Sequence, residues 1–279
     1  MILNDKLPID QVYDILIAKI GDYFKKAGKQ RAVVGLSGGI DSAVVMALAC
    51  KALGTDNVHG ILMPSQFSTV QSVSDAVDLA DNLNAKYDII PIEKIYGKFM
   101  SEMESYFKFG EWSVAQENLQ ARIRGTILMT YSNKFDALLL NTSNKSELCT
   151  GYGTLYGDLC GSIMVIADLY KVQVYELANY INTDDNVIPA AIMQKAPSAE
   201  LHPGQKDSDS LPVYDQLDPI LYALNEEGKS VDRLISEGAD KVLLDRILRL
   251  MHGAAFKVHQ LAPVITVSDK PVVPANKCL

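Results

Sequence analysis

The chain has 279 residues, of which 48% are apolar and 22% are charged. This length and composition predict one large α/β domain, or a domain with an appendage, built on a sizeable core. The formal net charge of −8, without a long run of like charges, argues against a nucleic-acid partner. No apolar run approaches the roughly 18 residues of a membrane span, so we expect no membrane association. The four cysteines form no C-x-x-C motif and no signal peptide is evident, which favours a reducing, cytoplasmic location.

Apolar segments alternate with helical patterns over the first two thirds of the chain. The predicted helices are at 8–27, 43–53, 72–84, 93–107, 115–132 and 171–181, and the predicted strands are at 31–36, 58–63, 87–92, 137–142 and 163–167. The strands are apolar almost throughout, which indicates a parallel sheet covered by helices on both faces. In such doubly wound sheets, ligands bind at the carboxyl ends of the strands.

The sequence changes character beyond residue 186. Residues 196–215 hold three prolines and a cluster of acidic and serine positions, so we predict a long, ordered flap. Helices are expected afterwards, followed by a proline-containing tail without periodicity. The predicted organisation is a single domain, 1–279, with a nucleotide-binding α/β core at 1–186, a flap loop at 187–212 and a helical C-terminal part at 213–279, whose helices lie at 213–226, 230–237 and 240–256.

The most informative stretch is residues 35–42, Gly-Leu-Ser-Gly-Gly-Ile-Asp-Ser, which joins a predicted strand to a helix N-terminus. Unpaired backbone N–H groups and the positive end of the helix dipole favour a phosphate there. Gly38 and Gly39 let the backbone approach a ligand closely. Asp41 fits if Mg²⁺ bridges its carboxylate to phosphate oxygens, the usual way this ion is held. The alternative is an ordinary glycine-rich turn capped by Ser42.

A second polar stretch, residues 141–158, begins where a buried strand is predicted to end. It combines hydroxyls, amides and a carboxylate in one turn, and Glu147 could supply a second carboxylate to a metal opposite Asp41. A turn rich in Asn and Ser, with Glu147 on a solvated first helical turn, is an equally open interpretation.

Three further polar residues are candidates for substrate contacts. Asn118 and Arg122 are four residues apart on a predicted helix and so share a face, which suits a ribose or phosphate. A solvated polar face explains them as well. Lys257 ends the last predicted helix, where a lysine commonly complements the helix dipole.

Taken together, these stretches resemble the NAD synthetases, which belong to the N-type ATP pyrophosphatases. The family's motifs occur in family order over about residues 10–263. The resemblance is nearest to the synthetase domain of the glutamine-dependent bacterial enzymes. The motifs are S-G-G-I-D-S, E-N-L-Q-A-R-I-R-G, N-T-S-N-K-S-E, G-Y-G-T-L-Y-G-D, P-S-A-E-L and Q-K-D-S-D-S-L-P.

The resemblance implies a doubly wound fold of the adenine nucleotide alpha hydrolase-like type and a two-step reaction. The carboxylate of deamido-NAD attacks the α-phosphate of ATP to form an adenylate and pyrophosphate, and ammonia then displaces AMP to give NAD. It also implies catalytic roles for Asp41, Glu147 and Lys171, with Mg²⁺ held by Asp41 and Glu147. ATP would be bound by Gly35, Leu36, Ser37, Gly38, Gly39, Ile40, Asp41, Ser42, Thr142, Lys171 and Ser198, and deamido-NAD by Asn118, Arg122, Glu147 and Lys257.

The resemblance also predicts partners. The synthetase pattern starts almost at Met1, so we expect no N-terminal glutaminase domain. Ammonia would then be taken up free or come from a separate glutaminase. Family members are homodimers, and a homodimer is expected here by resemblance.

Two departures from the family pattern matter. Val258 and His259 stand where the family usually has arginines, which questions some phosphate binding. Leu155 and Ser162 replace a Lys and an Asp that bind substrate in the stand-alone ammonia-dependent enzymes, leaving those contacts unassigned. An adenylating enzyme that thiolates tRNA, or a non-catalytic nucleotide-binding regulator, remain the alternatives.

Overall fold

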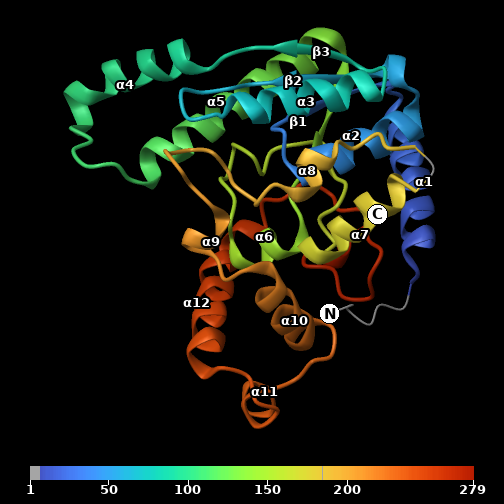
Figure 1. Ribbon diagram of the computed structural model, residues 1–279, viewed down its shortest axis with the longest axis vertical. Helices are drawn as coiled ribbons and strands as arrows, with labels where there is room; N and C mark the ends of the chain where they lie inside the picture. Colours follow the sequence, from blue (N-terminus) through green and yellow to red (C-terminus); the bar gives the residue numbers. More distant parts are fainter. Residues whose placement is uncertain (1–6, 184) are drawn as a thin grey trace.

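The computed structural model describes residues 7–183 and 185–279 (Figure 1). Five parallel strands form one sheet in the order β3-β2-β1-β4-β5, which confirms the predicted parallel sheet. The strand order reverses between β1 and β4, and in such folds ligands bind at this switch point, beyond the carboxyl ends of the strands. The strands are β1 Arg31–Leu36, β2 Val58–Leu62, β3 Lys86–Ile89, β4 Ala137–Asn141 and β5 Ile163–Met164.

Side chains of β1 alternate between two helical layers because successive residues of a strand point to opposite faces. Val34 and Leu36 join one apolar core, whereas Val33 joins another on the opposite face. The first core is covered by α1 Ile9–Ala27, α2 Ile40–Leu53, α3 Val70–Asn82 and α7 Lys171–Ile181, and the second by α4 Glu93–Phe107 and α5 Val114–Phe135. These two covered faces account for the apolar strands seen in the sequence.

The last third of the chain forms a helical part that packs against α6 Lys145–Thr150. Its three longer helices lie together at the bottom of Figure 1, away from the sheet. Because α6 directly follows β4, this helical part lies next to the carboxyl end of β4, at the switch point of the sheet. The remaining helices are α8 Ala190–Gln194, α9 Asp207–Ser210, α10 Tyr214–Asn225, α11 Val231–Ser236 and α12 Lys241–Val258.

Several predicted bounds were wrong. The third strand ends at Ile89 and not at residue 92; Pro91 has no backbone N–H to continue a ladder. The fifth strand stops at Met164 instead of residue 167, because its neighbour β4 ends at Asn141, the residue paired with Met164. On its other side Met164 meets the tail, where the N–H of Ile265 donates to its carbonyl at 3.1 Å. The second helix begins at Ile40, three residues earlier than predicted, so that Asp41 lies in its first turn.

Two segments are more regular than the sequence indicated. The predicted flap loop, 187–212, contains the short helices α8 and α9. The tail, 263–279, is not irregular: Val264 bridges in parallel to Met164 on one side and to Cys278 on the other. Among the described residues, no helix has both the length and the apolar character needed to cross a membrane.

Candidate active site

The loop between β1 and α2 is braced by its own side chains. The N–H of Ser37 donates to Ser42 Oγ at 3.3 Å, Ser42 Oγ donates to the carbonyl of Gly39 at 3.0 Å, and the N–H of Gly39 donates to Ser37 Oγ at 3.2 Å. Gly38 has a φ of +76°, and a Cβ there would lie 2.1 Å from the carbonyl oxygen of Ser72. The loop therefore requires glycine at this position. Its conformation presents the first-turn amides of α2, which lack partners within the helix, to a ligand.

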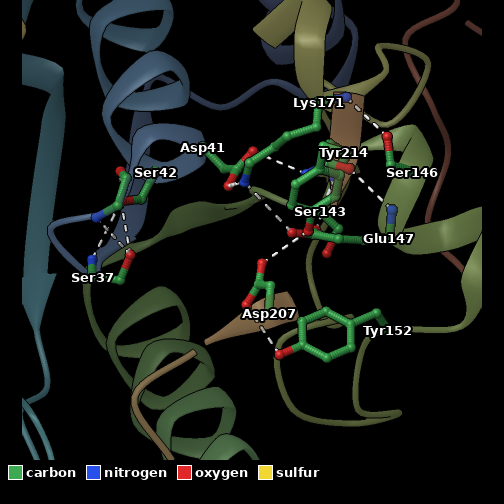
Figure 2. Close-up of polar contacts among 12 residues, drawn as sticks. Ser37, Asp41, Ser42, Ser143, Ser146, Glu147, Tyr152, Lys171, Asp207 and Tyr214 are labelled. Atoms are coloured by element: carbon green, nitrogen blue, oxygen red, sulfur yellow. Dashed lines mark hydrogen bonds and ion pairs between the residues drawn. The ribbon is translucent and has the colours of Figure 1, made fainter. Parts of the chain in front are cut away.

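Three charged side chains from three elements meet beside this loop (Figure 2). Lys171, which begins α7, donates to Oδ2 of Asp41, and its Nζ lies 4.0 Å from Oε1 of Glu147. Asn144 Nδ2 donates to the other carboxylate oxygen of Asp41 at 3.0 Å. The structure thus brings together the three residues predicted to be catalytic.

The charges of this cluster perturb one another. Burial alone lowers the pKa of Lys171, but the carboxylates of Asp41 and Glu147 outweigh it, so the pKa is raised and the ammonium persists at neutral pH. Burial, and then the charge of Asp41, raise the pKa of Glu147 well above its usual range. The carboxylates of Asp41 and Glu147 therefore share one cation, Lys171, so the cluster can accept a second positive charge.

Glu147 is positioned by α6, a helix that the sequence analysis offered only as an alternative, in which Glu147 lay on a first helical turn. Asn144 caps it: Asn144 Oδ1 accepts the N–H of Glu147 at 3.0 Å, and Glu147 Oε2 accepts the N–H of Asn144 at 3.2 Å. This reciprocal pattern is a capping box, and the Asn-x-x-Glu spacing was the signal that could have revealed the helix. One carboxylate oxygen of Glu147 stays with the helix and the other faces Lys171.

The buried Lys145 holds α6 in place through a network of hydrogen bonds and ion pairs. Its Nζ donates to Asp168 Oδ1 at 2.9 Å, Glu226 Oε1 at 2.5 Å, Ser268 Oγ at 3.1 Å and the carbonyl of Lys270 at 2.8 Å. These partners come from the segment before α7, the end of α10 and the tail. The network joins α6 to three distant parts of the chain.

Ser146 and Asp218 lock α6 to α7. The N–H of Lys171 donates to Ser146 Oγ at 2.9 Å, Ser146 Oγ donates to Asp218 Oδ1 at 2.6 Å, and the N–H of Val172 donates to Asp218 Oδ2 at 3.0 Å. Burial raises the pKa of Asp218 to about 6. These bonds therefore fix the position of α6, which carries Glu147, relative to α7, which carries Lys171.

A third carboxylate, Asp207 of α9, completes the cluster and was missed by the sequence analysis. Tyr152 donates its hydroxyl to Asp207 Oδ1 at 3.1 Å, and Tyr214 donates to Oδ2 at 2.8 Å (Figure 2). The ring of Tyr214 lies 5.3 Å from Lys171 Nζ, a cation–π contact. The Q-K-D-S-D-S-L-P motif contained Asp207, but nothing in that motif pointed to these distant partners.

The flap is tied to the wall of the site at its N-terminal end. Glu200 accepts from the N–H of Thr69 at 3.2 Å and from Lys195 Nζ at 3.0 Å, and Ser72 Oγ donates to the same carboxylate. Ser198 Oγ donates to the carbonyl of Gln205 within the flap at 2.6 Å. The flap therefore closes over α3, whose first turn also contacts the phosphate loop at Gly38.

A cavity of about 600 Å³ lies between the phosphate loop, the charged cluster and the flap. Most of the residues predicted to bind ATP or deamido-NAD line it, and only Gly38 and Arg122 do not. The predicted residues on its wall are Gly35, Leu36, Ser37, Gly39, Ile40, Asp41, Ser42, Asn118, Thr142, Glu147, Lys171, Ser198 and Lys257.

The residues predicted to contact the dinucleotide are not equivalent. Asn118 faces the cavity and accepts from Thr154 Oγ1 at 2.7 Å. Lys257 Nζ donates to the carbonyls of Gly151 and Gly153 at 2.7 and 2.6 Å, and burial lowers its pKa. Arg122 is exposed, and its Nε donates to the carbonyl of Leu155 at 3.3 Å. Its predicted role stays a prediction.

The donor set suits a hard divalent cation that is shared with a ligand. Asp41 and Glu147 are oxygen donors on one wall of the cavity. No group of three or more His, Cys, Asp and Glu side chains arranged for a metal occurs within residues 7–183 and 185–279. Two carboxylates without a full protein cage fit Mg²⁺, which is commonly completed by phosphate oxygens and water.

A five-stranded parallel sheet with a phosphate loop at its switch point is the adenine nucleotide alpha hydrolase-like fold. Within this class, the sequence profile of the NAD synthase family matches residues 12–261. The chain belongs to the NAD synthase family. It is 45% identical over 261 residues to a glutamine-dependent NAD(+) synthetase of Synechocystis, covering 94% of this chain and 47% of that protein. The chain thus spans about half the length of the curated relatives it matches.

Solved structures of two proteins of similar length support the same family assignment. An NMN synthetase from Francisella tularensis superposes with a TM-score of 0.78 at 30% identity, covering 90% of this chain and 96% of that one. An NH3-dependent NAD synthetase from Campylobacter jejuni gives a TM-score of 0.74 at 34% identity, with the same coverage of both chains.

Proposed function

We propose that this chain makes NAD from deamido-NAD, ATP and ammonia through an adenylated intermediate, releasing pyrophosphate and AMP. The observation that carries the proposal is the Asp41–Lys171–Glu147 cluster, which lies beside a phosphate loop on one wall of a single cavity. A reaction that expels pyrophosphate needs cations and backbone donors where the negative charge develops. The cluster and the loop supply both.

Each part of the wall has a role in this proposal. The loop amides hold the ATP phosphates, Lys171 places its ammonium beside them, and Thr142 and the flap residue Ser198 also line the cavity. Asp41 and Glu147 would hold Mg²⁺. When bound, this ion would neutralise phosphate charge and orient the leaving group.

The other end of the cavity is proposed to take deamido-NAD. Asn118, Glu147 and Lys257 line the same cavity and would contact this substrate. Lys257 also shapes the 151–153 loop through the two carbonyls it binds. Arg122 could contribute only from the rim, because it is exposed and is not among the residues that line the cavity.

Ammonia as the nitrogen donor is supported by the state of the cysteines. Hydrolysis of glutamine by a cysteine requires a thiolate, and thiolates form where the thiol pKa is depressed. Burial instead raises the pKa of all four thiols, to about 12 for Cys50 and Cys149 and about 11 for Cys160. None of them is a candidate glutaminase nucleophile.

A second candidate substrate is the mononucleotide counterpart of deamido-NAD. The similarity to an NMN synthetase of nearly the same length favours testing it, since that protein superposes over 90% of this chain. Amidation of a nicotinate carboxylate is the same chemistry in both cases. The two substrates differ only in the adenylate half.

The decisive experiment incubates the purified chain with ATP, Mg²⁺ and ammonium, and adds either deamido-NAD or nicotinate mononucleotide. We expect NAD, AMP and pyrophosphate in equal amounts with deamido-NAD, and a rate that rises between about pH 7 and 9 as free NH₃ accumulates. Glutamine should not replace ammonium. Faster turnover of the mononucleotide would reassign the substrate, and NAD formation from glutamine at a comparable rate would overturn the choice of ammonia. The same preparation, analysed by sedimentation, tests the expected homodimer.

A further inference from the structure

The cationic side chains on the cavity wall differ in how they are held. Four of them line the cavity: Arg124, Lys171, Lys195 and Lys257. Lys171 is bound by the carboxylate cluster, Lys195 pairs with Glu200 at 3.0 Å, and Lys257 donates to two backbone carbonyls. Three of the four are therefore engaged by the protein itself.

Arg124 is the exception. It lies on α5, and its only hydrogen bond to a described residue runs from Nε to the carbonyl of Met63, just beyond β2, at 3.0 Å. Within the described part of the chain it forms no ion pair, and neither of its Nη atoms is sealed in the interior without a partner. The four N–H groups of its fork are thus available to a guest in the cavity.

The surroundings of Arg124 call for an anion. Burial lowers the pKa of its guanidinium to about 10, although the charges of Glu200 and Asp158 oppose this fall. The group stays protonated at neutral pH, so it is a cation largely withdrawn from water without a bonded counter-ion. Burying such a charge is unfavourable unless a group of opposite charge pairs with it.

Arg124 lies on the wall of the same cavity as the phosphate loop and Asn118. It bonds to the carbonyl of Met63, which also lines the cavity, and the charges of Asp158 and Glu200, two further lining residues, act on it. Both proposed substrates carry phosphates, and the planar guanidinium fork binds phosphate oxygens in bidentate fashion.

We propose that Arg124 binds a phosphate group of a nucleotide substrate through the free edge of its guanidinium. The inference rests on the proposed function, which places ATP and deamido-NAD in this cavity. It assigns the task to Arg124, which faces inward, and not to its neighbour Arg122, which is exposed.

Calorimetric titration of the full chain with Mg-ATP and, separately, with deamido-NAD tests the assignment. Arg124→Gln should weaken binding of one of the two nucleotides by about 10-fold or more, the effect of losing a charged hydrogen bond. Arg124→Lys should recover only part of it, because it keeps the charge but not the fork. The nucleotide that loses affinity identifies the phosphate. Arg249→Gln is the matched control: this exposed arginine of α12 contacts only the carbonyl of Asp245, and both affinities should stay unchanged.

Wild-type affinity of Arg124→Gln for both nucleotides, with an unchanged unfolding temperature, would overturn the inference. If Arg124→Gln does not fold, Arg124→Lys decides, because wild-type affinities in that variant exclude bidentate binding. NAD formation by the wild-type chain is followed in parallel. A chain that makes NAD while Arg124→Gln keeps both affinities refutes the inference alone, whereas a wild-type chain that makes no NAD refutes the proposed function.

Discussion

The phosphate loop and the charged cluster beside it are neighbours built in opposite ways. The serines that brace the loop are five positions apart, and every brace stays within residues 37–42. In the cluster, Lys171 reaches Asp41 across 130 positions, and α9 and α10 add Asp207 and Tyr214. The loop can keep its shape through local contacts, whereas the cluster exists only when several helices are docked. Variants that remove one kind of contact should therefore have different consequences.

The largest effect on stability is expected from Lys145→Met, which removes the ion pairs that hold α6 in place. It leaves the carboxylates of Asp168 and Glu226 buried without their cation, and breaking a buried ion pair typically costs about 3–5 kcal/mol. Urea denaturation should show that loss in the free energy of unfolding. Lys229→Met is the control, because its ion pairs with Glu227 and Glu237 are exposed and should contribute little to stability. Equal losses for the two variants would contradict the role given to the network.

Asp41→Asn separates the chemistry of the cluster from its structure. It removes a carboxylate from the proposed metal site while Asn144 can still bond to the remaining oxygen. Pyrophosphate release should fall by at least about 100-fold, as when a charge-stabilising group is removed from an active site. The circular dichroism spectrum should not change. Normal Mg²⁺-dependent turnover would refute the metal assignment.

A pH-dependent stability should identify Asp218, which joins α6, α7 and α10. Its pKa of about 6 in the folded chain is above that of an unfolded aspartate, so the native state holds the proton more tightly. Stability from this group is present below about pH 4 and is lost as pH rises through about 6, by on the order of 3 kcal/mol. Unfolding free energies from pH 4 to 7 for wild type and Asp218→Asn measure the difference. The slope due to this group should vanish in the variant, and an identical slope in both proteins would exclude Asp218 as its source.

The smallest effect is expected inside the loop. Ser37→Ala removes the hydroxyl that accepts from Gly39, a partly exposed hydrogen bond worth about 1 kcal/mol or less. Stability should fall by no more than this amount, since the bond from Ser42 to the carbonyl of Gly39 remains. A loss as large as that of Lys145→Met would show that the loop also depends on distant contacts.

The same contrast explains what the sequence could predict. The parallel sheet follows from apolar strands alternating with helices, and the loop at 35–42 from its glycines and serines, which are local features. Asp207 and Tyr214 could not be found, because their relation to Lys171 depends on how α9 and α10 dock. The helix α6 stayed only an open alternative, although Asn144 and Glu147 show its capping box.

The expectation that Asn118 and Arg122 both face the substrate shows a further limit of prediction from sequence. Residues four apart do share a helix face, but the face of α5 that lines the cavity runs through Asn118, Ala121, Gly125 and Leu128, with Arg124 beside it. Periodicity identifies which residues lie together on a helix. It does not say which face turns inward, because that is set by packing against the sheet.

The tail that continues the sheet beyond β5 bears on how the protein stays in solution. An unpaired outer strand exposes a row of N–H and C=O groups that can recruit a strand from another molecule. Here the N–H of Met164 donates to the carbonyl of Pro263 at 2.8 Å, and Val264 in turn pairs with Lys277 and Leu279. The opposite outer strand, β3, carries Lys86 and Asp88. Deleting residues 263–279 would uncover the β5 edge, and self-association should follow even if the nucleotide cavity were intact.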